Sequence, residues 1–392
     1  MSARSTAAAI ASILTFALLT AWVPAQWPVY LAEGMAFAVA ALWMAVRIVR
    51  PGTVVLHPWL AAPVLAAAWG LWQLASGQTV YAWKTWEATF AWAANAAVMF
   101  LALQCFSEAR ERERWLRRFV YFGLAMAVFS VLQLYTSDAK VFWRFTTPRD
   151  FVMGTLGYKN HYAAFVELLF SVAIWQAARS RHRALYTVAA GIIAATTVAA
   201  VSRAGVALVI LELCACLAML KRRQLISWRA AGLIAAGFTI AGALFVGVFE
   251  WERFERKLET GAEGDTRLLI YGSAVEMVRE RPWTGFGLGT WTTVYPAYAH
   301  YDRGLFVNAA HNDWLEWAGD GGLPVAAVLG ALAIASVAPA FRSVWGIGIP
   351  AVFVHALVDF PFQLPALSLL VFVLLGAAAS NKFPPKAQNG LE

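Results

Sequence analysis

The chain has 392 residues, of which 60% are hydrophobic and only 14% are charged, and its formal net charge at pH 7 is +8. This composition, with a mean hydropathy of +0.60, excludes a single soluble domain and is typical of a polytopic helical membrane protein. The positive charge does not indicate a nucleic-acid partner, because the basic residues lie in short loops between apolar runs.

Apolar runs of roughly 20 residues recur along nearly the whole chain, and a helix is the structure that satisfies each backbone group of such a run in lipid. We therefore predict an all-α polytopic fold with about 12 transmembrane helices, in which residues 1–392 form a single membrane domain. The first run lacks a convincing cleavage site and is expected to be the first span. The predicted spans are 7–25, 28–47, 58–76, 85–106, 118–136, 160–178, 185–202, 204–220, 230–249, 314–340, 344–360 and 363–380.

The loops between the predicted spans indicate the orientation. The basic connectors 107–118, 179–183 and 221–229 fall on one side of an alternating topology. By the positive-inside rule that side is the cytoplasm, so both termini are expected there. Carboxyl groups within spans should face the bundle interior; these are Glu33, Glu87, Glu167 and Glu212.

Two segments on the opposite, periplasmic side, 137–159 and 250–312, are too long for simple turns. A long connection in a compact protein is usually functional or disordered, and the Gly-rich and aromatic content of 250–312 favours an ordered, functional loop. We expect it to contain short helices and to lie between the ninth and tenth spans.

Three basic segments on this periplasmic side are candidate anion sites. Lys159 and Asn160 begin a span, where a cation and an amide suit an anionic headgroup, although Asn160 also suits a helix cap. Arg203 stands at the tip of a tight Ser-Arg-Ala-Gly turn, either as an interfacial side chain or as a bidentate ligand for phosphate. Arg267 follows a predicted helix start at Asp265 and opposes the helix dipole, which suggests either a pair with Asp265 or a ligand.

The "GFGLG" run within 264–289 resembles a nucleotide loop only superficially. It lacks the Lys-Ser/Thr of a P-loop and the strand of a dinucleotide-binding unit, so we predict no nucleotide site.

His311 stands alone before the tenth predicted span. A lone histidine is more often structural than catalytic, yet its titration near neutral pH suits general-base work beside the cations above. Asn312 is expected to cap the following helix and to orient the imidazole. His355 and Asp359, four residues apart, should share a helix face as a structural or orienting pair. The six histidines are scattered without an HxxxH or HxH pair, so no metal site and no cofactor are predicted.

The sequence resembles the bacterial O-antigen ligase and O-antigen polymerase superfamily, polytopic glycosyltransferases of the GT-C type. The resemblance covers roughly residues 150 to 365 and rests on the order and spacing of several motifs. These motifs are Lys159-Asn160, Ser202-Arg203-x-Gly205, the Arg267 segment running to "ERPWTGFGLGTW", His311-Asn312-x-x-Leu315 with "GGLP", and "VDFPFQLPA".

The resemblance implies periplasmic transfer of a glycan from an undecaprenyl-diphosphate donor to an acceptor hydroxyl, with inversion and without a metal. In the ligase branch the acceptor is the lipid A–core. His311 then corresponds to the general base, and Arg203 and Arg267 to the residues that hold the diphosphate. Lys159 and Asn160 belong to the same site, and Asn312, Asp359 and His355 orient its groups.

Two alternatives remain open. A polysaccharide polymerase of the same superfamily uses a second lipid-linked glycan as the acceptor. A transporter or flippase for lipid-linked glycans suits the number of spans, but should show inverted repeats or paired broken helices, and neither is visible in the sequence.

Overall fold

The computed structural model describes residues 1–147, 152–245, 247, 262–300, 304 and 306–380, and these residues are almost entirely helical. One antiparallel hairpin, β1 (Lys140–Val141) with β2 (Phe145–Thr146), interrupts the helices. The all-α prediction is confirmed. The helices are α1 (Ala3–Thr20), α2 (Trp27–Val49), α3 (Ala61–Ala75), α4 (Ala82–Phe106), α5 (Ala109–Thr136), α6 (Lys159–Arg179), α7 (Arg183–Ala199), α8 (Arg203–Arg222), α9 (Trp228–Phe245), α11 (Ala262–Glu280), α12 (Trp291–Val294), α13 (Asp313–Ser343), α14 (Gly348–His355) and α15 (Pro365–Ala379), with the 3-10 turns η1 (Pro58–Leu60), η3 (Tyr295–Ala297) and η4 (Pro361–Gln363).

Seven of the described helices are long and apolar enough to cross a membrane: α1, α2, α4, α5, α6, α8 and α13. Shorter apolar helices occur at α7, α9 and α15. The polytopic character is therefore confirmed, whereas the number of about 12 spans and the sidedness of the loops remain predictions.

The predicted span 344–360 contains only α14, which has 8 residues. At about 1.5 Å per residue such a helix is about 12 Å long, and the hydrocarbon core is about 30 Å thick. A single crossing helix over this range is not confirmed, because α14 ends at His355 and the chain turns before Pro361.

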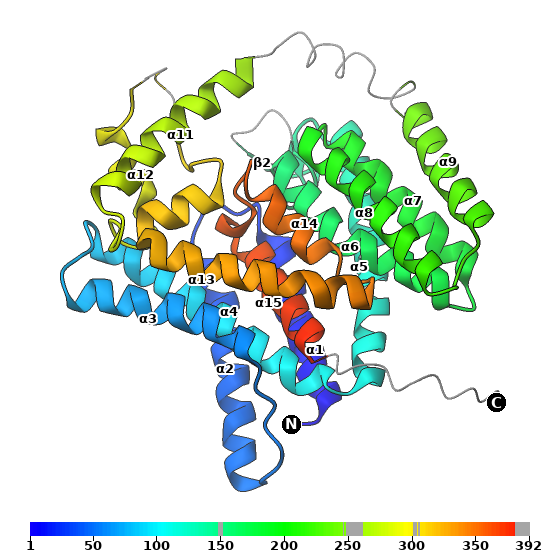
Figure 1. Ribbon diagram of the computed structural model, residues 1–392, viewed down its shortest axis with the longest axis horizontal. Helices are drawn as coiled ribbons and strands as arrows, with labels where there is room; N and C mark the ends of the chain where they lie inside the picture. The colour runs from blue at the N-terminus through cyan, green and yellow to red at the C-terminus, as the bar shows by residue number, and fades with distance from the viewer. Residues whose placement is uncertain (148–151, 246, 248–261, 301–303, 305, 381–392) are drawn as a thin grey trace.

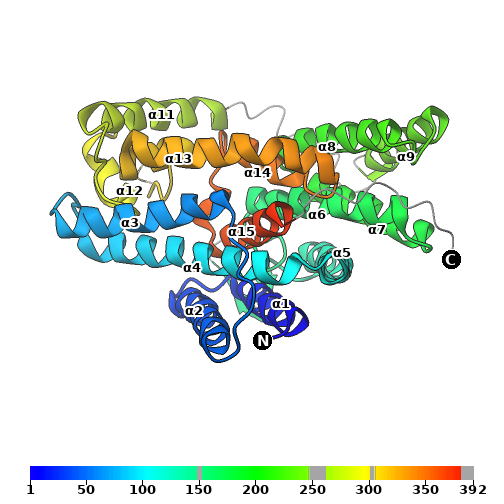
Figure 2. The ribbon, with the colours of Figure 1, turned by 60° about the horizontal axis from the view of Figure 1, so that its bottom comes forward.

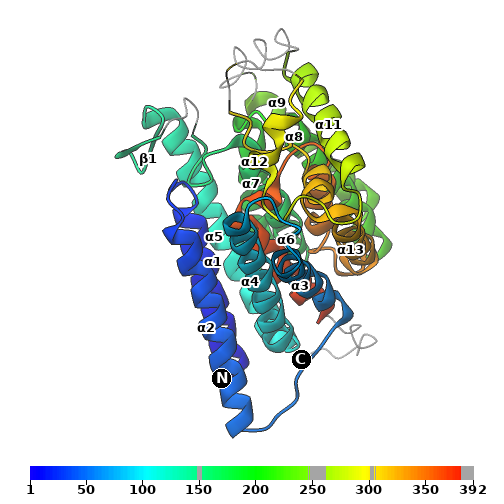
Figure 3. The ribbon, with the colours of Figure 1, turned by 90° about the vertical axis from the view of Figure 1, so that its left-hand side faces the viewer.

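The centre of the bundle is α6, whose side chains are buried continuously from Asn160 to Gln176. It packs against α7, α8 and α14, while α15 packs against α4 (Figure 1). Figure 2 shows α3, α4 and α13 side by side, with α11 lying along α13. Helices α1 and α2 form an antiparallel pair that flanks α4, as Figure 3 shows from the side. The carboxylates of the spans follow the predicted pattern, since Glu33, Glu167 and Glu212 are buried and Glu87 is partly buried.

The Gly-rich run around Gly287 connects the segment between α11 and α12 to the bundle. Phe286 N–H donates to the Gly319 carbonyl at 3.1 Å, and Gly287 N–H donates to the Asp320 carbonyl at 2.9 Å. On the other side, Leu288 N–H donates to Oε1 of Gln73 at 3.0 Å. Gly287 has a φ of +116°, which favours glycine. The run therefore docks between α3 and α13, and the glycines allow the close approach.

We predict that Gly348→Ala destabilises the contact between α14 and α6. A Cβ at Gly348 overlaps the carbonyl oxygen of Glu167, a backbone atom that cannot rotate away. Overpacking of this kind costs about 1–3 kcal/mol, so the melting temperature in detergent should fall. The matched control is Gly191→Ala in α7, where a Cβ meets nothing within 4 Å. An equal melting temperature for Gly348→Ala and Gly191→Ala contradicts this packing.

Candidate functional site

A buried carboxylate, Asp359, connects three distant parts of the chain. It is 1% exposed, and its Oδ2 accepts a hydrogen bond from Nδ2 of Asn160 in the first turn of α6. Its Oδ1 accepts from the backbone N–H of Phe360 at 2.8 Å. Nη2 of Arg267 in α11 lies 3.7 Å from Oδ2, and Nη1 donates to the Val358 carbonyl at 2.8 Å. One carboxylate therefore joins α6, α11 and the turn that follows α14.

Burial explains why these donors gather. A carboxylate removed from water is costly unless it is paired and hydrogen-bonded. Asn160 and Arg267 supply the pairing, and the Arg267 side chain remains 26% exposed. The guanidinium therefore still has a face from which a further anion can be reached.

His311 is held in an unusual backbone conformation next to this group. Its φ is +52°, a left-handed value that costs a non-glycine residue of order 1–3 kcal/mol and is frequent at functional sites. The Tyr271 hydroxyl donates to the His311 carbonyl at 2.9 Å. Burial raises the pKa of Tyr271, which keeps this hydroxyl protonated as a donor. Tyr271 is one helical turn beyond Arg267, so both act from one face of α11.

Asn312 fixes His311 to the same turn that carries Asp359. Its Oδ1 accepts from the backbone N–H of Leu315 at 3.1 Å, which confirms the predicted N-cap of α13. Its Nδ2 donates to the Leu357 carbonyl at 2.9 Å. The next residue, Asp313, donates its backbone N–H to the Ala356 carbonyl at 2.9 Å. The start of α13 and the 356–359 turn therefore form one hydrogen-bonded unit.

Phe360 is the aromatic centre of this unit. The His311 ring meets it edge-on, with centroids 4.9 Å apart and an interplanar angle of 81°. His161 meets it in the same way at 4.9 Å and 84°, and Tyr158 stacks on it at 5.6 Å. The two imidazoles, from α6 and from the start of α13, thus pack against one phenyl ring. Orientation of His311 is set by packing as well as by its backbone.

Two sequence-based predictions about polar partners are wrong. Asn160 does not cap α6, because the N-cap is Tyr158 and Asn160 bonds Asp359 instead. His355 does not pair with Asp359 on one helix face, because α14 ends at His355. The His355 ring nitrogen Nδ1 lies 2.7 Å from Oε1 of Glu167, and both side chains are fully buried. His355 therefore stabilises the contact between α14 and α6.

The remaining predicted cations lie at the starts of two neighbouring helices. Lys159 is the first residue of α6 and is half-buried, while Arg203 is the first residue of α8 and is exposed. The N-cap of α8 is Ser202, as the tight turn predicts, and its Oγ accepts from Gly205 N–H at 3.2 Å. A Cβ at Gly205 overlaps that of Ala163, so the first turns of α6 and α8 are in close contact. Arg203 and Asn160 thus belong to adjacent helix starts. The alternative partner of Arg267, Asp265, lies at a position whose side chain is outside the described part of the structure.

Sequence reasoning missed Tyr271 and Phe360 and did not give His161 a role. The spacing of Tyr271 from Arg267 is the one available signal, since residues four apart share a helix face. Among the described residues, no group of three or more His, Cys, Asp or Glu side chains is arranged to hold a metal ion.

Residues 188–330, a little over a third of the chain, match the O-antigen ligase family. No curated protein matches the sequence. The matched segment runs from α7 into α13 and includes Arg203, Arg267 and His311, three residues that the motif order singled out.

The match over residues 188–330 supports the O-antigen ligase/polymerase superfamily.

Members of the O-antigen ligase family are membrane enzymes of the glycosyltransferase type, acting as ligases or polymerases on lipid-linked glycans and glycan acceptors. The family match stops at residue 330. Lys159, Asn160 and Asp359 lie outside it, and they join the matched segment through the Arg267–Asp359–Asn160 contacts. The matched segment is therefore in contact with α6 and with the turn after α14 through Arg267 and Asp359.

We predict that Asp359→Ala destabilises the protein more than Arg267→Ala does. Loss of Asp359 leaves buried donors of Asn160 and Phe360 unpaired, at about 1–3 kcal/mol. Loss of Arg267 leaves the hydrogen bonds from Asn160 and Phe360 to Asp359 in place. It removes a 3.7 Å ion pair whose guanidinium is 26% exposed and screened by water, worth about 1 kcal/mol or less. Thermal unfolding in detergent measures both variants. Glu276→Ala serves as a control, because its contact with His300 is exposed. If Arg267→Ala is the more damaging change, Asp359 is not the residue that joins these segments.

Proposed function

We propose that this protein is a ligase-like glycosyltransferase that moves a glycan from undecaprenyl diphosphate to a hydroxyl of lipid A–core at the periplasmic face. The observation that carries the proposal is that Arg267 contacts Asp359, and Asn312 and Asp313 bond the turn that ends at Asp359. These contacts bring Arg267 and the segment of His311 to one turn. The His311 ring contacts Phe360 and the Arg267 guanidinium contacts Asp359 and Val358, so an imidazole and a permanent cation contact the same turn. Transfer from a diphosphate leaving group needs a general base and a group that stabilises negative charge, and these two side chains are our candidates.

In the proposed reaction His311 accepts the proton of the acceptor hydroxyl. The hydroxyl oxygen forms a bond to the anomeric carbon, and the bond from that carbon to the diphosphate oxygen breaks with its electron pair. Attack from the opposite face inverts the anomeric centre. Arg203, Arg267 and Lys159 stabilise the negative charge of the departing diphosphate, so the chemistry needs no divalent ion.

Asn160, Asp359 and Asn312 act as positioning residues in this scheme. Asp359 holds Arg267 against α6, and Asn160 shares that carboxylate. Asn312 fixes the strained backbone of His311 through Leu315 and Leu357. Removal of a positioning group lowers the rate without removing the base.

A polymerase of the same family is the alternative, in which a second lipid-linked glycan replaces the lipid A–core acceptor. It uses the same base and the same cations. A transporter of lipid-linked glycans is less well supported, because the sequence shows neither the inverted repeats nor the paired broken helices typical of transporters.

We predict that His311→Ala and His311→Asn each lower transfer by about 100-fold or more, since general-base catalysis contributes about 10²–10⁴-fold. The assay uses purified protein, an undecaprenyl-diphosphate glycan and lipid A–core, with product resolved by electrophoresis. Asn tolerates the left-handed backbone of residue 311, so His311→Asn separates loss of the base from loss of the fold. Full activity in His311→Asn overturns the assignment of the base. Elongation of the donor instead of capping of the acceptor indicates the polymerase.

Arg203→Ala and Arg267→Ala should each lower kcat by about 100-fold to 1,000-fold, as loss of one preorganised charge-stabilising group does elsewhere. Wild-type activity should be unchanged in EDTA, because the proposed charge stabilisation comes from guanidinium groups. Exposed Arg279→Ala on α11 is the control for general charge loss. An EDTA-sensitive wild type, restored by a divalent ion, contradicts the metal-free scheme.

A further inference from the structure

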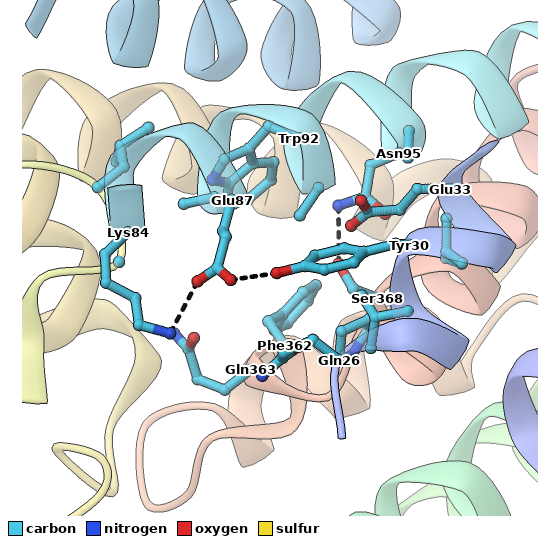
Figure 4. A pocket seen from close by; sticks show the side chains of 18 of the residues that line it. Gln26, Tyr30, Glu33, Lys84, Glu87, Trp92, Asn95, Phe362, Gln363 and Ser368 are labelled. Atoms are coloured by element: carbon cyan, nitrogen blue, oxygen red, sulfur yellow. Dashed lines mark hydrogen bonds and ion pairs between the residues drawn. The ribbon is translucent and has the colours of Figure 1, made fainter. Parts of the chain in front are cut away.

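A cavity of about 250 Å³, lined by apolar surface with several polar side chains, lies between α2, α4, α13 and the start of α15 (Figure 4). It is separate from the group formed by His311, Arg267, Asp359 and Phe360, called the His311 cluster below. Its wall includes Leu288 and Gly289 of the docked Gly-rich run. Its polar lining comes from Tyr30 and Glu33 of α2, Lys84 and Glu87 of α4, and Asp320 of α13. Helices α2 and α4 begin on the same predicted side of the membrane as α13, so the cavity belongs to the periplasmic half.

Part of this lining is already paired. Nζ of Lys84 lies 2.7 Å from Oε2 of Glu87, and the Tyr30 hydroxyl donates to the other oxygen of that carboxylate. Nδ2 of Asn95 donates to Oγ of Ser368 at 2.9 Å. These contacts hold the side chains in place around the cavity, as Figure 4 shows.

Three acceptors on the lining remain open. Glu33 is only 6% exposed, and among the described residues it makes no hydrogen bond and no ion pair. Oδ1 of Asn95 and Oδ1 of Asp320 are likewise buried without a hydrogen-bond partner there. Figure 4 shows the carboxylate of Glu33 next to the amide of Asn95 at the cavity. Buried acceptors are costly without donors, so their arrangement around one cavity points to a ligand rich in donors.

The lining of the cavity favours a neutral ligand over an anion. Three carboxyl groups, Glu33, Glu87 and Asp320, face a single ammonium group, Lys84. The guanidinium of Arg267, which suits an anion, lies against Asp359 at the other side of the 359–363 segment. Rings of Tyr30, Trp92, Trp317 and Phe362 complete the lining. Aromatic walls with a few fixed acceptors suit a ligand with apolar faces and hydroxyl edges, which is the chemistry of a sugar ring.

The segment 359–363 separates the cavity from the His311 cluster and touches both. Asp359 and Phe360 contact Arg267 and His311, whereas Phe362 and Gln363 line the cavity. Asp313, two residues after His311, accepts from Phe362 N–H at 3.0 Å and from Nε2 of Gln363 at 3.3 Å. A sugar chain in the cavity is therefore one short segment away from the proposed base.

We propose that this cavity is a glycan subsite, in which Glu33, Asn95 and Asp320 accept hydrogen bonds from the hydroxyl groups of a neutral sugar ring. The inference rests on the proposed function for the identity of its ligand as a glycan. The ring belongs either to the acceptor oligosaccharide or to the glycan of the donor, and both present the same hydroxyl chemistry.

Binding of two free glycans tests the subsite without any turnover. The probes are deacylated lipid A–core oligosaccharide and the O-antigen repeat oligosaccharide, titrated calorimetrically into the full chain in a detergent without a sugar headgroup. We expect Glu33→Leu to weaken at least one probe by tenfold or more while the melting temperature is kept, because Glu33 has no partner to lose. Ala91→Phe, which fills the cavity from α4 without removing a polar group, should do the same.

The matched control is Glu212→Leu, because Glu212 is also a buried carboxylate without a hydrogen-bond partner in the described residues but lies outside the cavity. It should leave both affinities unchanged. Loss for the core probe alone assigns the acceptor, and loss for the repeat alone assigns the donor. The proposal is overturned if wild type binds neither glycan, if Ala91→Phe and Glu33→Leu bind both normally, or if Glu212→Leu has the same effect. Wild-type binding without any transfer leaves the subsite standing and contradicts the proposed function instead.

Discussion

The carboxylate of Asp359 is the group on which the candidate site depends. It is buried at a turn between two short helical segments, and it is stabilised by donors from α6 and α11 that are far away in the sequence. A carboxylate in such surroundings needs these donors, so its burial and the convergence of Asn160 and Arg267 are one physical requirement. The start of α13 is held at the same turn, because Asn312 and Asp313 donate hydrogen bonds to its backbone carbonyls. Without that turn, the side chains of His311 and Arg267 would have no element that both of them contact.

The bilayer explains why polar groups are so informative in this chain. Carboxylates and histidines within a helical bundle are expensive, and they persist where they meet one another or a ligand. His355 and Glu167 meet one another in the core. Glu33, Asn95 and Asp320 instead border a cavity. The same rule thus separates a structural pair from a candidate binding surface. On one side of 359–363 the partly exposed guanidinium of Arg267 suits an anion, and on the other side the open acceptors of the cavity suit a neutral glycan.

The sequence alone was sufficient for the helical membrane class and for the buried position of most span carboxylates. It also singled out Arg267, His311 and Asp359, whose segments meet at one turn, while their membership of one active site remains a prediction. Their order along the chain and their residue types carried that inference. Partner choice was less predictable, because a hydrogen bond depends on tertiary contact. Asn160 suits a helix cap locally, yet it bonds a carboxylate 199 residues later. His355 and Asp359 suit a helix face, but the helix ends between them. Phe360 gains its role from packing against His311 and His161, and Tyr271 gains its role from a hydrogen bond to the His311 carbonyl, which are both tertiary contacts. The placement of Lys159 and Arg203 at the diphosphate remains a prediction.

The most direct measurement is an electron cryo-microscopy structure of the protein in a nanodisc with a non-hydrolysable undecaprenyl-diphosphate glycan and lipid A–core. The account predicts the diphosphate against Arg203 and Arg267, and an acceptor hydroxyl within about 3 Å of the His311 imidazole. It also predicts that the ion pair of Arg267 with Asp359 is retained. A diphosphate bound in the carboxylate-lined cavity, or a His311 ring turned away from both substrates, contradicts it.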